Sequence, residues 1–197
     1  MSSAVTNPSP WLTLILLTLL CVLLQYAGLD EWLIYQRQAI GDGQLWRLLS
    51  GNLLHTNLWH LLMNMAGLWV VVFIHRMHYA HWQLALLLLL LLLLEGAGLY
   101  WGFPQLMAYV GLSGVLHGLF AYGALCDIRI GWRSGYLLLA GVTLKVIWEQ
   151  LQGGNAQMTQ LIDARVATEA HLVGLLSGVL LFAAYTLLSS RPNRNAR

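Results

Sequence analysis

Long runs of apolar residues divide the sequence into six segments, and short stretches with polar and charged residues separate them. A run of about 20 mainly apolar residues is long enough to cross the hydrocarbon core of a bilayer as a helix. The segments lie at about 11–29, 53–74, 82–100, 112–128, 135–151 and 167–188. This pattern predicts an all-α membrane protein built as a bundle of six transmembrane helices.

The composition supports this prediction and excludes several other classes of protein. Of the 197 residues, 58% are hydrophobic and only 9% are charged, far from the averages of soluble domains. A formal net charge of +2 offers no basic patch, so we expect no nucleic-acid partner. The high hydrophobic content also excludes a disordered chain. Cys21 and Cys126 both lie in apolar segments, so we expect two packed side chains and no disulfide or thiolate metal site.

The basic residues predict the orientation, because Lys and Arg in short loops are retained on the cytoplasmic side. With six spans both termini share one side, and that side carries six arginines against three on the other. We therefore expect cytoplasmic tails at 1–10 and 189–197 of a single domain covering 1–197. The first segment lacks a preceding basic residue and a small-residue cleavage site, which predicts a retained anchor. Residues 30–53 form the outer first loop, long enough to fold on the membrane surface.

Polar residues inside the apolar segments are candidates for function, because burying an ionisable group in lipid costs free energy. The second, fourth and sixth segments all run inward, and each carries polar residues near its outer end. These are His55, His60 and Asn64, then Ser113 and His117, then Glu169 and His171. Their similar depth is what one shared site requires. Lys145 and Glu149 are spaced to form a structural pair on one helix face, and Glu95 has no evident partner.

Small residues predict which of these segments touch, because small side chains every four positions let two membrane helices pack closely. This spacing links Gly114 to Gly118, and Ala170 to Gly174 and Gly178. Contact between the two helices brings the Ser113 hydroxyl within reach of the His171 imidazole. A nucleophile beside a base is the minimum apparatus for acyl transfer.

Acyl transfer also needs hydrogen-bond donors for the oxyanion that develops. His60 and Asn64 are four residues apart on one helix face and can both donate there. The backbone N–H groups of Ser113 and Gly114, at a helix N-terminus, add further donors. No carboxylate that would orient His171 is evident, because the nearest one in sequence faces the opposite side of its helix. We therefore expect a Ser-His dyad without a third member.

Four motifs, in order, resemble those of the rhomboid intramembrane serine proteases, and the resemblance covers residues 46–178. They are Trp46-Arg47, His60-Leu61-Leu62-Met63-Asn64, Gly111-Leu112-Ser113-Gly114 and Ala170-His171-x-x-Gly174-x-x-x-Gly178. The resemblance implies a six-helix rhomboid-like bundle in which Ser113 is the nucleophile and His171 the general base. It implies that His60 and Asn64 stabilise the oxyanion. The implied reaction is hydrolysis of a peptide bond in or beside a substrate's transmembrane segment, without a cofactor.

Within that family, the small six-span form and the run Gly111 to Gly118 are most similar to rhombosortases. These bacterial inner-membrane members process proteins with a C-terminal Gly-Gly motif, a hydrophobic helix and a basic tail. The resemblance implies a site that opens toward the periplasm, with membrane-protein substrates and the lipid bilayer as partners. His117, one turn after Ser113, stands where many rhomboids have a tyrosine that packs on the catalytic histidine. It can pack on His171, hydrogen-bond to it, or act as an accessory base.

Other interpretations fit parts of the sequence. A catalytically silent relative would use the fold to bind or escort membrane proteins, but it would normally lack the serine or the histidine. A transporter would line a path through the bilayer, whereas these polar residues cluster in the outer third. His75, His78 and His81, with Arg76, could suggest a metal cluster. They have no carboxylate or thiolate partner in sequence, so we interpret this segment as an interface loop and predict no metal site.

Overall fold

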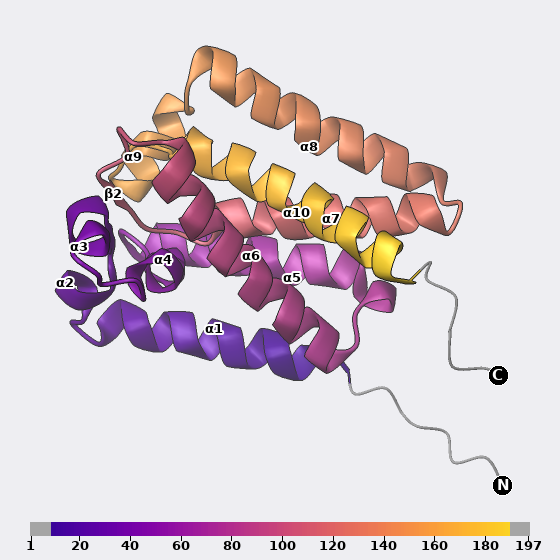
Figure 1. Ribbon diagram of the computed structural model, residues 1–197, viewed down its shortest axis with the longest axis horizontal. Coiled ribbons are helices and arrows are strands. Elements are labelled where there is room, and N and C mark those ends of the chain that lie inside the picture. Colours follow the sequence, from indigo (N-terminus) through magenta and orange to yellow (C-terminus); the bar gives the residue numbers. More distant parts are fainter. Residues whose placement is uncertain (1–8, 190–197) are drawn as a thin grey trace, which may run out of the picture.

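Six long helices make up most of the computed structural model, which describes residues 9–189 (Figure 1). They are α1 (Trp11–Tyr26), α5 (Leu58–Ile74), α6 (His81–Gly102), α7 (Ser113–Arg129), α8 (Arg133–Gln152) and α10 (Thr168–Ser189). Each helix falls on one of the six predicted segments. The largest difference is at the second, where the helix starts only at Leu58. The predicted tails 1–10 and 189–197 lie almost entirely outside the described residues.

The helices differ in how well they suit a membrane. By length and hydropathy, α6 and α10 can each span a bilayer. A third span results if the stretch Arg47–Leu53 and the helix α5, which meet at a bend of 94°, count together, and α1 is a shorter apolar helix. The helical bundle is thus confirmed, whereas six membrane crossings stay a prediction.

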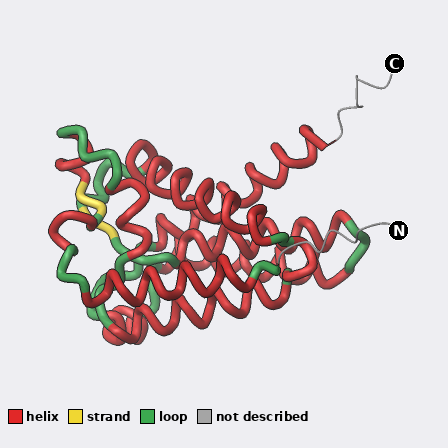
Figure 2. The backbone as a smooth tube through the Cα atoms, turned by 90° about the horizontal axis from the view of Figure 1, so that it is seen from below, coloured by secondary structure: helices red, strands yellow, loops and turns green. Residues whose placement is uncertain are grey.

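Short elements gather at one end of the bundle, which we call the loop end (Figure 1). They are α2 (Asp30–Leu33), β1 (Tyr35–Gln36), α3 (Arg37–Gly41), α4 (Arg47–Ser50), η1 (Gly51–Leu53), β2 (Ala108–Tyr109) and α9 (Ala156–Ile162). Figure 2 shows the two strands, in yellow, among the loops of this end. They pair antiparallel, Tyr35 opposite Tyr109. The first loop, residues 30–53, therefore has structure of its own, as predicted, and it is joined to the residues just before α7.

Arg47 ties the first loop together. Its side chain is buried although it is charged, and it makes three hydrogen bonds within the loop. The acceptors are Gln44 Oε1 at 2.7 Å and the carbonyls of Ile34 and Glu31, both at 2.8 Å. A planar guanidinium with several fixed donors suits such convergent carbonyls. The helix α4 that carries Arg47 packs on α6, where a Cβ on Gly96 would meet the Leu48 carbonyl.

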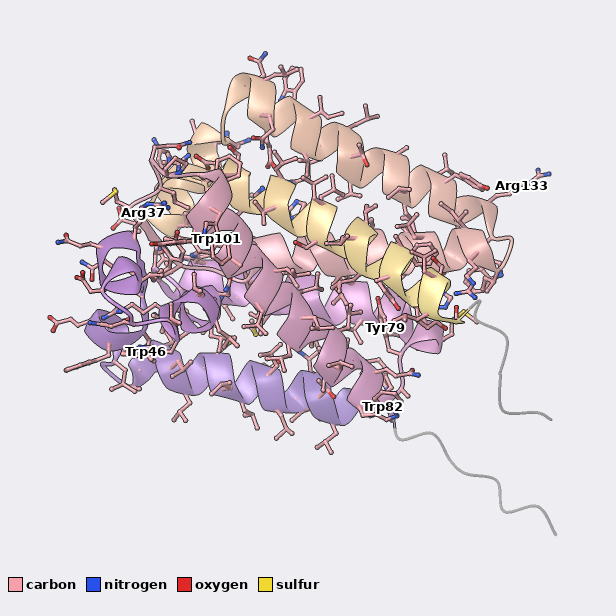
Figure 3. All side chains as sticks on the ribbon, viewed as in Figure 1. Arg37, Trp46, Tyr79, Trp82, Trp101 and Arg133 are labelled. Carbon is pink, nitrogen blue, oxygen red and sulfur yellow. The ribbon has the colours of Figure 1, made fainter. Side chains whose placement is uncertain are left out.

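Tryptophans and arginines mark the two ends of the bundle (Figure 3). Trp46, Trp101 and Arg37 lie at the loop end, and Trp82 and Arg133 lie at the opposite end, where α1 begins and α10 ends. Tryptophan is typical of both interfaces of a bilayer. This placement agrees with the aromatic belts expected of a membrane protein.

The helices α7 and α10 pack backbone against backbone. A Cβ on Gly118 would lie 2.6 Å from the Gly174 carbonyl oxygen. A Cβ on Gly174 would meet the carbonyl of Gly114, and one on Gly178 would meet that of Gly118. Side chains larger than hydrogen would therefore separate the helices. The contact predicted from the spacing of small residues is confirmed.

A buried polar cluster lies at the end opposite the loops. His78 Nε2 is 2.5 Å from Asp127 Oδ1 and His75 Nε2 is 3.5 Å from Asp127 Oδ2. The expectation that this histidine loop has no carboxylate partner is wrong, because the partner comes from α7, distant in sequence. The cluster fastens η2 (Arg76–His78) and the end of α5 to α7. The side chain of His81 lies outside the described structure.

Candidate active site

Ser113 and His171 face each other at the loop end of the bundle. Ser113 is the first residue of α7, and His171 lies in the first turn of α10. The Ser113 Oγ and His171 Nε2 atoms are 2.9 Å apart, within hydrogen-bonding distance. The close α7–α10 packing sets this distance, because Gly114 and Gly174 allow the two helix starts to approach.

The second ring nitrogen of His171 has a carboxylate partner, contrary to expectation. His171 Nδ1 lies 2.7 Å from Glu149 Oε2, which comes from α8. Both side chains are largely shielded from solvent, with 7% of His171 and 14% of Glu149 exposed. The arrangement is therefore Ser-His-Glu and not an isolated dyad. Glu169, which the sequence placed on the opposite side of its helix from His171, pairs with Arg165 through two 3.0 Å contacts.

Lys145 joins Glu149 to His117. Its Nζ donates to Glu149 Oε1 at 2.6 Å, which confirms the predicted pair on α8, and lies 3.1 Å from His117 Nε2. The other nitrogen of His117, Nδ1, is 2.7 Å from the Ser113 carbonyl oxygen. An ammonium can only donate and a carbonyl can only accept. His117 is therefore neutral, with its proton on Nδ1.

Three of these side chains have the spacing of metal ligands by distance alone. One ligand atom each from His117, Glu149 and His171 lies within 4.8 Å of the others. However, the Lys145 ammonium contacts two of the three groups, at 2.6 and 3.1 Å. A cation at this place would meet an existing positive charge, so the residues fit an ion-pair network and do not fit a metal centre.

His60 and Asn64 lie on α5 beside the turn that precedes Ser113. A Cβ on Gly111 would be 2.8 Å from His60 Nε2 and 3.9 Å from Asn64 Nδ2. Gly111 has a φ of +128°, so both its conformation and its surroundings require glycine. Asn64 Nδ2 is buried and has no hydrogen-bond partner within residues 9–189. Such an unpaired donor beside the turn that precedes Ser113 is available for a ligand.

Tyr109 and Glu95 pack against the turn that precedes Ser113. The Tyr109 hydroxyl contacts both Glu95 Oε1, at 2.9 Å, and the Gly111 carbonyl oxygen, at 2.5 Å. Burial, and the Glu95 carboxyl beside it, raise the pKa of the Tyr109 phenol well above its usual value, so the hydroxyl stays neutral. Glu95 is fully buried against the start of α7, where a Cβ on Gly114 would meet its carboxyl group. Glu95 therefore has a partner that the sequence did not reveal.

A cavity of about 280 Å³ opens beside Ser113 and His60. Ile162, the last residue of α9, and residues 164–167, which precede α10, line its other side. This segment is fastened to the start of α5, because the Thr56 hydroxyl donates to the Ile162 carbonyl at 2.5 Å and Asn57 Nδ2 to the Leu161 carbonyl at 3.0 Å. The cavity offers space for a substrate group next to the serine.

Comparison with known proteins identifies the family of this chain. Residues 42–188 match the Rhomboid domain family. The chain is also similar to the rhomboid protease GlpG of Yersinia enterocolitica, with 28% identity over 165 residues. The aligned region is 81% of this chain, and it spans only 56% of the length of that relative. The family match covers most of the chain and every residue of the site described above, and the chain therefore belongs to the rhomboid family.

Proposed function

We propose that this protein is an intramembrane serine endopeptidase. The observation that carries the proposal is the 2.9 Å contact between Ser113 Oγ and His171 Nε2, made by two helices whose glycines permit it. A serine hydroxyl becomes nucleophilic when a base removes its proton in the transition state. The similarity to a rhomboid protease supports the same chemistry.

The reaction follows from the positions of the two side chains. His171 Nε2 takes the proton of Ser113 Oγ as that oxygen attacks the peptide carbonyl carbon, which gives a tetrahedral intermediate. The intermediate collapses as the carbon–nitrogen bond breaks and His171 returns the proton to the leaving amine. A water molecule, deprotonated by the same imidazole, then attacks the Ser113 ester. The imidazole returns that proton to Ser113 Oγ as the ester carbon–oxygen bond breaks, which releases the acid and restores the serine.

The oxyanion of the intermediate needs preorganised donors. We assign this role to Asn64 Nδ2, His60 Nε2 and the backbone N–H of Gly114 in the first turn of α7. His60 can donate from Nε2 when its Nδ1 accepts the Thr56 N–H, which is 3.4 Å away. The free N–H groups at a helix start favour negative charge.

We further propose a rhombosortase-type substrate, a membrane protein with a Gly-Gly motif, one hydrophobic helix and a basic tail. An apolar groove of about 370 Å³ lies between α5, α7 and α8 and ends at His117 and Lys145, next to the site. A hydrophobic helix can lie along such a groove, and the small Gly-Gly motif can enter the cavity beside Ser113. This substrate and the basic-residue pattern favour an inner-membrane location, with the loop end facing the periplasm.

Cleavage of a reporter tests the proposal. A secreted domain fused to a Gly-Gly motif, a hydrophobic helix and a basic tail is placed in one membrane with the full-length protein. We expect cleavage by the wild type and none by Ser113→Ala or His171→Ala. A reporter with Val-Val in place of Gly-Gly tests the substrate class separately. Binding of the reporter without cleavage would favour the alternative function, a silent rhomboid-like factor that binds or escorts membrane proteins.

A further inference from the structure

The helix α8 brings a charged pair to the back of the Ser113–His171 contact. Glu149 Oε2 is 2.7 Å from His171 Nδ1, and Glu149 Oε1 is 2.6 Å from Lys145 Nζ. We propose that Glu149 is a positioning residue, held by Lys145, that makes His171 the base of a Ser-His-Glu arrangement. This inference rests on the proposed peptidase function and goes beyond a two-residue mechanism.

The first argument concerns the proton on His171. A neutral imidazole carries one proton, on either Nδ1 or Nε2. An ionised carboxylate is only an acceptor, so contact with Glu149 places the proton on Nδ1. The lone pair is then on Nε2, the nitrogen that faces Ser113 Oγ. Glu149 thus selects the tautomer that can remove the serine proton, and it fixes the plane of the ring.

The second argument concerns charge. When His171 accepts the serine proton it becomes a cation, and a carboxylate 2.7 Å away stabilises that cation. The contact lies in a largely shielded place, where such interactions are stronger than in water. The Lys145 ammonium, 2.6 Å from Glu149 Oε1, adds to the preference for the ionised carboxylate, but 51% of its own side chain is exposed, so its charge is less shielded than that of Glu149.

The third argument concerns position. Gln150 Nε2, on the residue after Glu149, donates to the Thr168 carbonyl at the start of α10 at 2.8 Å. This hydrogen bond fixes α8 against the first turn of α10, the turn that carries His171. Lys145 adds a link to α7 through His117 Nε2 at 3.1 Å. The three helices of the site are therefore held by one polar network.

Titratable side chains approach His171 from three other helices. Glu149 and Lys145 face it from α8, His117 from α7 and His60 from α5. On α10 itself, the Glu169 carboxylate forms an ion pair with Arg165. Glu149 is the one anion of this group in contact with the ring. Changing its charge, or that of its partner Lys145, should therefore change the pH profile of labelling at Ser113.

The test uses the purified full-length protein and a serine-reactive fluorophosphonate probe, and measures the labelling rate against pH. Glu149→Gln keeps the size of the side chain and removes its charge. We expect the maximal rate to fall by at least about 100-fold, with the acid limb of the profile at lower pH. Lys145→Met removes the positive charge beside the Glu149 carboxylate. The acid limb of the labelling profile of this variant should therefore move to higher pH. Lys145→Arg should restore the wild-type limb.

Glu169→Gln is the matched control, because it makes the same change two residues from His171 on a carboxylate paired elsewhere. It should keep the wild-type rate and profile. A purely structural role of Glu149 would lower the labelled fraction at every pH without moving either limb, and that result would overturn the proposal. So would a wild-type rate and profile in Glu149→Gln. A wild type that is not labelled at Ser113 at any pH would instead overturn the peptidase function, and the positioning role with it.

Discussion

The imidazole rings of His117 and His171 are stacked, with their centroids 4.1 Å apart and their planes inclined by 20°. Both nitrogens of His117 have other partners, the Ser113 carbonyl and the Lys145 ammonium. His117 therefore has no lone pair to offer to the serine. Of the three roles that the sequence left open for it, this geometry favours packing on His171.

Variants of His117 test the packing role. Phe keeps a ring against His171 and removes both hydrogen bonds, whereas Ala removes the ring as well. Because Phe keeps the stacked ring, we expect His117→Phe to label with fluorophosphonate within about tenfold of the wild type. The stacked ring pair itself contributes about 0.5–1.5 kcal/mol, which only the Ala variant loses. His117→Ala should label more slowly than His117→Phe. Equal and complete loss in both variants would instead indicate that the imidazole takes part in proton transfer.

The α7–α10 contact makes a prediction about stability. Gly174→Ala would place a Cβ on the Gly114 carbonyl, and we expect the free energy of unfolding to fall by about 1–3 kcal/mol, with loss of labelling at Ser113. Gly141→Ala is the matched control, because a Cβ on this helical glycine meets no atom within 4 Å. It should be neutral, or stabilising by about 0.5–1 kcal/mol. Thermal unfolding in detergent measures both, and equal effects would contradict the packing account.

The buried Arg47 makes a second prediction about stability. Arg47→Ala leaves the carbonyls of Ile34 and Glu31 without their donor, and we expect a loss of about 3 kcal/mol. Arg47→Lys should recover only part of it, since an ammonium cannot reproduce the fork of donors. Arg133→Ala, at an exposed side chain, is the control and should unfold like the wild type. Full recovery by lysine would show that charge alone matters at this position.

His75 gives a prediction about how the unfolding temperature depends on pH. Burial lowers the pKa of His75 below its usual value, although Asp127 acts in the opposite direction. Below the ordinary histidine pKa of 6.5, the unfolded chain gains a proton at this residue that the folded chain does not bind. Stability should therefore fall as pH is lowered from about 7.5 to 5. His75→Phe should reduce this slope, and an unchanged slope would assign the effect to other groups.

The sequence revealed those parts of the site that depend on one helix or on one repeated spacing. His60 and Asn64 share a face because they are four residues apart, and the glycines of α7 and α10 predicted the contact that joins Ser113 to His171. These inferences need no knowledge of how a third helix is rotated. The same reasoning located the six long helices, because each is an apolar run of sufficient length.

Partners from a third helix could not be found in this way. Glu149 was interpreted as half of a structural pair with Lys145, and that pair exists, but one carboxylate oxygen also reaches His171. Which face of α8 meets α10 depends on side-chain packing, because α8 lacks a stripe of small residues that would predict it. Asp127 was missed as the partner of His75 for the same reason.

The most direct test of the central claim is to label the folded protein in membranes with a fluorophosphonate and identify the modified residue by mass spectrometry. The account predicts a single adduct, on Ser113, that disappears in both Ser113→Ala and His171→Ala while each variant remains folded. An adduct that survives in His171→Ala at the wild-type rate, or one found on another serine, would contradict the assignment of Ser113 and His171 as nucleophile and base.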